Sequence, residues 1–376
     1  MKQALSFLLS VLLLIGALSG CAGTASTEPE EDTVETITVV DHAGNEVTLP
    51  KTIERIAVCN ILPLPSVLAV FFDSADKIVA MAPSSMTAAE NSLLSELYPE
   101  ILHADTSAIG ASDVNTEELM KLDPQVVFYN ASSPQLGETL RKAGFNAVAI
   151  SVNKWDYNAV ETLNQWLDLL TQIFGDSTNE RAKQVREYSE KSMDLVNERT
   201  AGLSEEERAK VFFLFQYSDE SIVTSGQHFF GQWWADAIGA DNVASELQED
   251  NSVKVTLEQI YAWNPEQILI TNFTTAGPVD LYNSTFGSYD WSGIQAVQDQ
   301  KVYKMPLGMY RSYTPGIDTP ITLLWLAKTV YPEQFEDLDV LEETVKYYRD
   351  IFGVELTAQQ AESIFAPAVS AGKTYF

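Results

Sequence analysis

The sequence has few cysteines, few basic residues and only one long apolar run. Its 376 residues include 2 cysteines, 3 histidines, and 23 lysines and arginines against 53 acidic residues, for a formal net charge of −30. A surface this negative repels phosphate backbones and anionic head groups, so nucleic-acid binding and electrostatic membrane binding are disfavoured. Because the one apolar stretch of near-spanning length lies at the N-terminus, a multi-pass membrane protein is also excluded.

Common catalytic motifs are missing too. The chain has no nucleophile elbow, no H-E-x-x-H, no P-loop and no G-x-G-x-x-G. Thr224-Ser225-Gly226 places a serine beside a glycine but lacks the G-x-S-x-G setting. Because carboxylates are so abundant in this chain, their presence alone is no evidence for a catalytic site. We therefore expect a protein that is not an enzyme. A lipid-anchored hydrolase with paired carboxylates stays open as the alternative.

The N-terminus has the pattern of an export signal. Lys2 precedes an apolar run over residues 4–17, which ends in Leu18-Ser19-Gly20-Cys21. This tetrad resembles the lipobox of bacterial lipoproteins, in which the cysteine is lipidated and the preceding peptide removed. We therefore expect residues 1–20 to be a lipoprotein signal peptide. The alternative is an ordinary signal peptide, or a transmembrane anchor, with a chance cysteine.

Cys21 and the residues after it predict how the folded part is held. Residues 21–36 are almost free of apolar side chains and predict a flexible tether from a lipidated Cys21. The folded part is then extracytoplasmic and anchored to the outer face of the bacterial cytoplasmic membrane. With Cys21 carrying lipid, Cys59 has no disulfide partner, and its apolar surroundings predict a small core residue.

The folded part alternates short β-rich runs with helical patterns, which predicts an α/β fold with parallel sheets and helices on both faces. Length alone suggests about two domains. We expect an N-terminal hairpin over residues 37–49, an N-terminal lobe over 37–177, an interlobe helix within 178–203 and a C-terminal lobe over 204–376. The predicted strands are 55–59, 77–81, 125–129, 147–151, 211–216, 267–272 and 302–306, and the predicted helices are 66–72, 117–122, 135–143, 231–238, 256–263 and 319–330.

Residues 178–199 separate the two series. They contain no glycine or proline and are dense in Glu, Lys and Arg. A helix of this length, rising 1.5 Å per residue, would span roughly 33 Å and could bridge two lobes. Because a single long helix is a stiff connection, we expect small lobe movements.

An internal repeat relates the two series. Residues 115–125 (NTEELMKLDPQ) align with residues 256–266 (TLEQIYAWNPE), an offset of 256 − 115 = 141. Both copies begin with a capping residue, carry Glu or Gln three positions later, stop at Asx-Pro and enter an apolar strand. The chain is therefore expected to hold two similar lobes.

Glu117 and Glu258 take equivalent early positions in the repeated helices. Carboxylates there complement the helix dipole, which alone would account for them. Their equivalent positions also place the two carboxylates symmetrically on one face of a two-lobed protein. A two-fold symmetric partner with basic side chains could dock on that face.

Together these features resemble the periplasmic-binding proteins that deliver ferric siderophores, haem and cobalamin to ABC importers. The resemblance covers nearly all of residues 37–350 and includes DHAGNEV at 41–47, both Glu-x6-Pro units, GADNVA at 239–244 and KVY at 301–303. It implies two Rossmann-like lobes joined by one long helix, the class III arrangement. It also implies that Glu117 and Glu258 salt-bridge arginines of a permease dimer.

The ligand is expected in the crevice between the lobes, because ligands bind outside the carboxyl ends of strands in open parallel sheets. Tyr310-Arg311-Ser312-Tyr313 suits an anionic chelate, since arginine offers a planar fork of donors and tyrosine a phenol and a stacking face. The alternative is a surface arginine paired with local acids. The predicted ligand-binding residues are Arg311, Tyr310, Tyr313, Tyr217, His228, Phe229, Trp155, Asn60, Met81, Tyr129 and Asn272, and neighbouring candidates are Leu62, Asn130, Asn153 and Phe273.

The histidines bear on the ligand class. Only His42, His103 and His228 are present, so a three-histidine site for bare zinc or manganese is disfavoured and a metal held inside a chelate is favoured. We expect a monomeric receptor with no cofactor of its own. Siderophore, haem and corrinoid all stay open, as do an oxyanion such as molybdate, a haem-iron role for His228 and a sensory module without a transport partner.

Overall fold

The computed structural model describes residues 35–110, 113–175 and 179–373. The expected signal peptide, Cys21 and the tether as far as residue 34 lie outside the described residues. From Glu35 onward the chain forms one compact unit. No helix in the described ranges has both the length and the apolar character needed to cross a bilayer.

The chain enters this unit through the expected β-hairpin. Strands β1 (Thr36–Val40) and β2 (Glu46–Pro50) pair antiparallel across a turn at residues 41–45. The Asp41 carboxylate accepts hydrogen bonds from the backbone N–H of Asn45 (2.8 Å) and of Ala149 (2.9 Å). One buried side chain thus closes the turn and ties the hairpin to the first sheet.

The first sheet is wholly parallel, in the order β4-β3-β5-β6. Its strands read as continuous apolar runs because helices cover both faces. Cys59 is buried at the end of β3, and burial raises the pKa of its thiol to about 12. The elements of this half are β3 (Ile56–Cys59), α1 (Leu64–Phe72), β4 (Ile78–Met81), α2 (Pro83–Glu90), α3 (Leu93–Leu97), η1 (Pro99–His103), α4 (Thr116–Lys121), β5 (Val126–Asn130), α5 (Pro134–Lys142), β6 (Ala147–Ile150) and α6 (Ala159–Phe174).

The second sheet is mixed, in the order β10-β8-β7-β11-β12, with β9 also on β7. Strands β7, β11 and β12 are parallel as expected, but β8 and β10 run antiparallel. The expectation of a purely parallel sheet is wrong here, because β7 turns back into β8 after only two residues. This half contains η3 (Glu205–Glu207), β7 (Lys210–Ser218), β8 (Ser221–Ser225), α8 (Phe230–Ala237), β9 (Asp241–Asn242), β10 (Ser252–Val255), α9 (Leu257–Trp263), β11 (Gln267–Ile270), α10 (Pro278–Asn283), α11 (Gln295–Gln298), β12 (Val302–Lys304), α12 (Thr319–Val330), α13 (Val340–Phe352), α14 (Ala358–Phe365) and η4 (Val369–Gly372).

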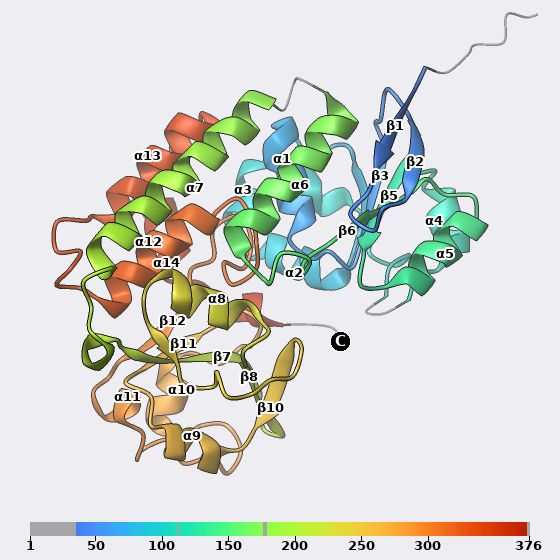
Figure 1. The fold of residues 1–376 in the computed structure, drawn as a ribbon. Helices are drawn as coiled ribbons and strands as arrows, with labels where there is room; N and C mark the ends of the chain where they lie inside the picture. Colours follow the sequence, from blue (N-terminus) through green and yellow to red (C-terminus); the bar gives the residue numbers. More distant parts are fainter. Residues whose placement is uncertain (1–34, 111–112, 176–178, 374–376) are drawn as a thin grey trace, which may run out of the picture. The chain divides into compact units, whose positions relative to one another are not determined.

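Helix α7 (Asn179–Thr200) is the expected long helix, and it contacts both halves. It packs against α6 of the first half and against α8, α12 and α13 of the second. Figure 1 shows it running beside α12 and α13. A single hydrophobic cluster includes side chains of α7 and of both sheets, so the two halves share part of one core.

The internal repeat is visible as matched geometry. Asn115 caps α4 by accepting from the backbone N–H of two first-turn residues, and Thr256 caps α9 in a capping box. Each helix is followed by an Asx residue in the left-handed region, Asp123 with φ 44° and Asn264 with φ 45°. Asx residues tolerate this conformation and let the chain turn through the following proline into β5 or β11.

The C-terminal segment crosses back to the first half. Helix α2 packs against η4, and the Ser370 hydroxyl donates to the Asn91 side chain. The backbone N–H of Leu93 also donates to the Gly308 carbonyl (3.1 Å). The last residues described therefore connect the two halves.

Candidate ligand-binding cleft

Residues at the carboxyl ends of strands in both halves enclose a small cavity of about 170 Å³. The first half contributes the β3–α1 loop and the ends of β5 and β6, and the second contributes β7, α8 and the segments after β11 and β12. We call it the apolar cavity, since apolar side chains dominate its wall. Its lining residues are Asn60, Ile61, Leu62, Pro63, Asn130, Val152, Trp166, Phe215, Phe230, Phe273, Thr314 and Pro315.

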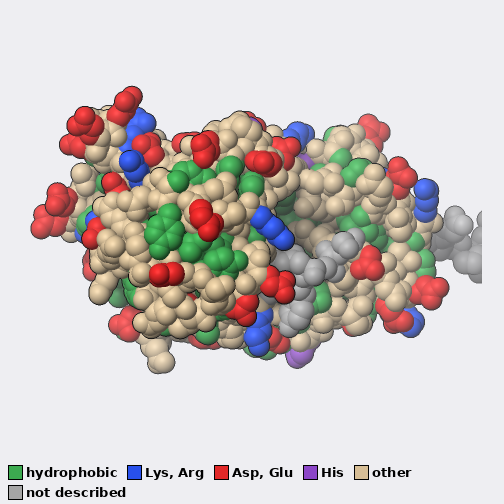
Figure 2. Space-filling view, turned by 90° about the horizontal axis from the view of Figure 1, so that it is seen from below, with side chains coloured by type: hydrophobic (Ala, Val, Ile, Leu, Met, Phe, Trp, Pro, Cys, Tyr) green, Lys and Arg blue, Asp and Glu red, His purple; other side chains and the backbone are tan. Residues whose placement is uncertain are grey.

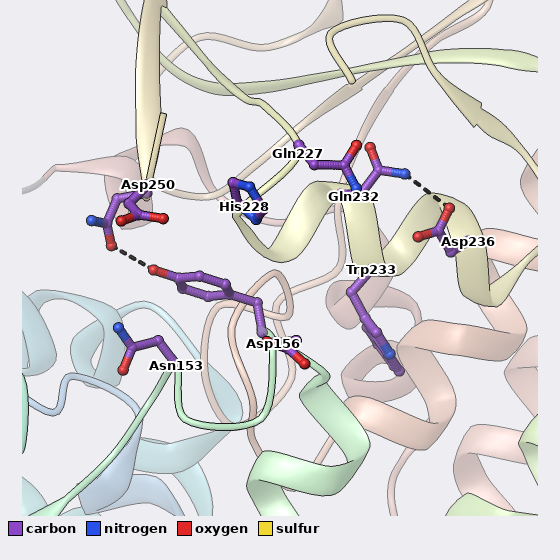
Figure 3. Close-up of a pocket in the computed structure, with 10 residues that line it drawn as sticks. Asn153, Asp156, Gln227, His228, Gln232, Trp233, Asp236 and Asp250 are labelled. Atoms are coloured by element: carbon purple, nitrogen blue, oxygen red, sulfur yellow. Dashed lines mark hydrogen bonds between the residues drawn. The ribbon is translucent and has the colours of Figure 1, made fainter. Parts of the chain in front are cut away.

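A larger cavity of about 520 Å³ borders the same loop, since Val152 lines the apolar cavity and Asn153, the next residue, lines the larger one. We call this the polar cavity. Figure 3 shows Asp250 and His228 on one side of it and Asn153 on the other. Its lining residues are Asn153, Asp156, Tyr157, Gln227, His228, Gln232, Trp233, Asp236, Asp250 and Asn251.

The loop after β6, which supplies the first half's share of the polar cavity, is held at Ser151 from two sides. The indole N–H of Trp166 donates to the Ser151 carbonyl (2.6 Å), and the Ser151 N–H donates to Nδ1 of His42 (3.1 Å). Burial lowers the pKa of His42 to about 4, which favours the neutral imidazole that this bond requires. The hairpin and α6 together fix where the loop begins.

Tyr157 joins the two halves across the cleft. Its hydroxyl donates to Oδ1 of Asn251 (2.7 Å), and its ring lies edge-on to Phe229 and Phe230, with centroids 5.4 and 5.0 Å away. Asp156 and Tyr157 both take left-handed backbone angles, φ 51° and 56°. Such angles are uncommon for a bulky residue and are retained where the surroundings enforce them.

Some of the sequence-predicted residues lie at these cavities. Asn60 lines the apolar cavity and His228 lines the polar cavity. Phe229 lies directly behind the wall, in ring contact with Tyr157 and Phe215. The neighbouring candidates Leu62, Asn130 and Phe273 line the apolar cavity, and Asn153 lines the polar one.

The prediction that Arg311 lies in the crevice is wrong, because this residue lines neither cavity. Its side chain is 1% exposed and donates to the carbonyl oxygens of Ala371 (2.9 Å) and Lys373 (2.9 Å). Its guanidinium lies over the ring of Phe273, 4.8 Å from the centroid. The C-terminal segment covers this arginine, so Arg311 supports the apolar cavity through Phe273 without lining it.

The two flanking tyrosines are buried with Arg311. The Tyr310 hydroxyl accepts from the arginine (3.3 Å), while the Tyr313 hydroxyl accepts from the backbone N–H of Gly231 (2.9 Å) at the start of α8. Burial raises the pKa of both phenols. The prediction that Tyr310 and Tyr313 line the crevice is therefore wrong as well, because both hydroxyls are hydrogen-bonded inside the core.

Tyr217 and Tyr129 also lie away from the cleft. Strand β7 continues to Ser218 because it pairs with β8, and a register shift near Leu214 separates the faces occupied by Phe215 and Tyr217. The Tyr217 hydroxyl accepts from the indole N–H of Trp291 (2.9 Å), and both residues belong to a hydrophobic cluster separate from the main core. Tyr129 points to the other face of the first sheet, where its hydroxyl accepts from Arg141 (3.1 Å).

Three further candidates have structural partners outside the cavities. Met81 is fully buried in the core. The Asn272 amide donates to the carbonyls of Met305 (2.7 Å) and Pro306 (3.0 Å), which ties the end of β11 to that of β12. Trp155 lies edge-on to His42, with ring centroids 5.0 Å apart, and so faces the hairpin.

Sequence reasoning missed most of the polar cavity. The pairing of β8 with β10 brings the residues before β10 beside those after β8, as the bridge between His228 and Asp250 shows. The β-rich runs at 221–225 and 252–255 were the available signal for this pairing. Of the lining residues that were missed, Gln227, Asp250 and Asn251 lie next to this strand pair, and the others come from the loop after β6 and from α8: Asp156, Tyr157, Gln232, Trp233 and Asp236.

Within the described ranges, no three His, Cys, Asp or Glu side chains are grouped so as to hold a metal ion. Acidic side chains outnumber basic ones on the face seen in Figure 2.

Comparison with known protein families matches residues 66–307 to the family model described as periplasmic binding protein. The match covers more than half of the chain. The chain belongs to the periplasmic binding protein family. The resemblance read from the repeat and the flanking motifs is therefore confirmed at the level of the family.

Known relatives agree with this assignment. The chain is 24% identical to the molybdate-binding protein MolA of Haemophilus influenzae over 334 residues, 84% of this chain and 90% of that protein. A solved periplasmic solute binding protein from Veillonella parvula aligns with a TM-score of 0.77 and 27% identity, covering 88% of this chain and 97% of that one. CeuE of Helicobacter pylori, solved as a Ni–His complex, aligns at 0.69 and 20% identity, covering 88% and 99%. The fold is thus the class III fold expected, with two α/β halves and a long helix.

Glu117 and Glu258 occupy the positions that the repeat predicts for them. Each is exposed in the first turn of its helix, α4 or α9. Among the described residues neither carboxylate forms an ion pair within 4.0 Å. Both side chains are accessible to a partner.

Proposed function

We propose that this chain is an extracytoplasmic substrate-binding lipoprotein that captures a metal chelate and delivers it to an ABC import permease. It acts by binding alone, without covalent chemistry. The observation that carries this proposal is the pair of cavities enclosed by both halves. One has an aromatic wall and the other a polar wall, the combination that orients a mostly apolar ligand through a few polar contacts.

Each cavity has its own part in this proposal. The rings of Trp166, Phe215 and Phe273 desolvate the organic body of the chelate in the apolar cavity. The polar cavity, where Asn153 and His228 face each other, holds the groups that stay hydrated. A siderophore, haem or a corrinoid has the required mixture of surfaces. Because the relative MolA binds molybdate, an oxyanion is the rival ligand.

The permease interaction rests on Glu117 and Glu258. Both are exposed, and each opens one of the repeated helices, so the two carboxylates are equivalent in the two halves. Paired arginines on a permease dimer would meet one carboxylate from each half. Lipidation at Cys21 and the tether that follows would keep the receptor beside that permease.

Uptake measurements on cells carrying charge-reversed receptors test this function. We expect E117K/E258K to abolish uptake of the bound chelate while its dissociation constant stays within about twofold, since exposed surface substitutions act locally. Glu342→Lys is the matched control, because Glu342 is also an exposed glutamate in the first turn of a helix, α13. Normal uptake by the double variant would contradict the docking role, and loss of ligand binding would contradict the assignment of the ligand to the cleft.

A further inference from the structure

The polar cavity has carboxylates on both of its walls. Asp156 comes from the loop between β6 and α6 in the first half, whereas Asp236 on α8 and Asp250 before β10 come from the second. Figure 3 shows the side chains of Asp156, Asp236 and Asp250 around one space, with His228 between the last two. Any ligand that fills this cavity meets negative charge from both halves.

Neither cavity offers a compensating cation. Among the described residues, the walls of the polar and apolar cavities include no lysine and no arginine. The buried Arg311 behind Phe273 is held by the carbonyls of Ala371 and Lys373. Lys304, at the end of β12, is also committed, because its ammonium donates to the carbonyls of Thr271, Thr274 and Ala276 at 2.7–2.8 Å.

The remaining polar-cavity side chains are suited to a cation. Tyr157 and Trp233 are among the lining residues, and aromatic rings attract ammonium groups. The side-chain carbonyl of Gln227 can accept a hydrogen bond from an N–H donor, whereas Oδ1 of Asn153 already accepts from the hydroxyls of Ser132 and Ser151 (3.3 Å each). Gln232 donates to one carboxylate oxygen of Asp236 (2.8 Å), and both residues line the cavity (Figure 3).

Resting on the proposed function, we infer that the ligand is a metal chelate carrying positive charge, such as a pendant ammonium group, at the end that enters the polar cavity. The apolar cavity takes the uncharged body of the chelate, and the carboxylates that line the polar cavity attract the cation. A free oxyanion or a chelate with exposed carboxylates would instead bring like charges together in a site with no basic side chain.

A matched pair of ligands tests this inference on the full-length protein in detergent. Ferrioxamine B carries a pendant ammonium group, and its N-acetyl derivative keeps the same iron hydroxamate core but is neutral. We expect tryptophan quenching to give about tenfold tighter binding for the ammonium form, at two- to fivefold for each exposed ionic contact. The difference should shrink as salt is raised, because exposed charges are screened.

Variants separate the cavity carboxylates from the general acidity of the surface. In D156N/D250N the ratio of the two affinities should fall to about threefold or less, with the N-acetyl form binding as before. Glu249→Gln is the matched control: Glu249 is exposed beside Asp250 but does not line the cavity, so the ratio should be unchanged. An unchanged melting temperature shows that each variant is folded.

Other outcomes separate this inference from the proposed function. Equal affinity for the two hydroxamates overturns the inference, as does tighter binding of molybdate or haem than of ferrioxamine B, and either result leaves a receptor in place. A chain that binds none of the four ligands contradicts the inference and the proposed function together.

Discussion

The two cavities of the cleft differ in how they are built. The apolar cavity is lined from the carboxyl ends of strands that were predicted in sequence, such as those before Asn60, Asn130 and Phe273. The polar cavity is lined by α8, by the loop after β6 and by residues next to the antiparallel pair β8–β10. The parallel strands therefore position the apolar wall, while α8, the loop after β6 and the antiparallel pair β8–β10 position the charged wall.

The residues of the apolar wall are also needed for stability, whereas the charged residues of the polar cavity are not. Trp166, Phe215 and Phe230 belong to the main hydrophobic core or pack against it, so the apolar wall cannot change without cost to folding. Asp156, Asp236 and Asp250 are exposed, so folding does not depend on burying them. Substitutions at these aspartates should therefore change recognition more than stability.

The largest expected effect comes from a tryptophan on each wall. Trp166→Ala removes a fully buried ring and its hydrogen bond to Ser151, and should lower the free energy of unfolding by about 3–5 kcal/mol. Trp233→Ala, in the polar cavity, is only half-buried and should cost about 1 kcal/mol. Denaturant unfolding measures both, and equal losses would remove the proposed division between the walls.

Arg311 gives the next largest effect, and on stability more than on recognition. Arg311→Met leaves the carbonyls of Ala371 and Lys373 without their donor, and we expect a loss of about 2–4 kcal/mol in unfolding free energy. The exposed Arg349→Met is the control and should have little effect. If Arg311→Met keeps its stability but loses ligand affinity, then Arg311 contacts ligand after all, as the sequence first suggested.

Acid should weaken the start of the polar-cavity loop through His42. The pKa of this buried imidazole is lowered to about 4, below the ordinary value of about 6.5, so protonation favours the unfolded chain. The stabilising contribution is complete above pH 6.5 and is lost as the pH falls toward 4, by about 2 kcal/mol after allowance for partial exposure. Unfolding measured from pH 7 to 4 should show this slope.

A histidine swap identifies the source of that slope. His42→Gln should flatten the pH dependence, whereas His103→Gln, which changes an exposed histidine, should leave it as it was. A slope that persists in His42→Gln would assign the acid sensitivity to other groups.

The smallest effect concerns the contact across the cleft. Tyr157→Phe removes the hydroxyl that donates to Asn251 but keeps the ring against Phe229 and Phe230, and should cost about 0.5–1.5 kcal/mol. A double-mutant cycle with Asn251→Ala measures this coupling directly. Coupling indistinguishable from zero would mean that the two halves are not joined at this point.

The sequence predicted the fold better than it predicted the site. Apolar strands, capped helices and the repeat are local patterns, and the repeat appears in the structure as matched caps and matched left-handed Asx residues. The carboxyl-end rule then located the apolar cavity. It could not say which neighbouring side chain faces the cleft, since a register shift in β7 places Phe215 there and Tyr217 on the opposite side.

The other errors depended on distant segments. Whether Arg311 is free or covered depends on residues about sixty positions later in the chain, which fold back over it. Asp250 joins His228 only because β8 and β10 pair antiparallel, and neither strand was predicted. Composition pointed to an anion-repelling surface, but only the structure puts three carboxylates around one cavity.

The most direct test of the account is whether a metal chelate stabilises the protein by occupying the cleft. Full-length protein in detergent would be unfolded with and without ferrioxamine B, haem, cobalamin and molybdate, alongside Val152→Trp, which fills the apolar cavity, and Val279→Trp, an exposed control on α10. A chelate at a hundredfold its dissociation constant should add about 2.7 kcal/mol to the wild type and to Val279→Trp, and little to Val152→Trp. Stabilisation that survives in Val152→Trp, or that comes from molybdate and from no chelate, would contradict the account.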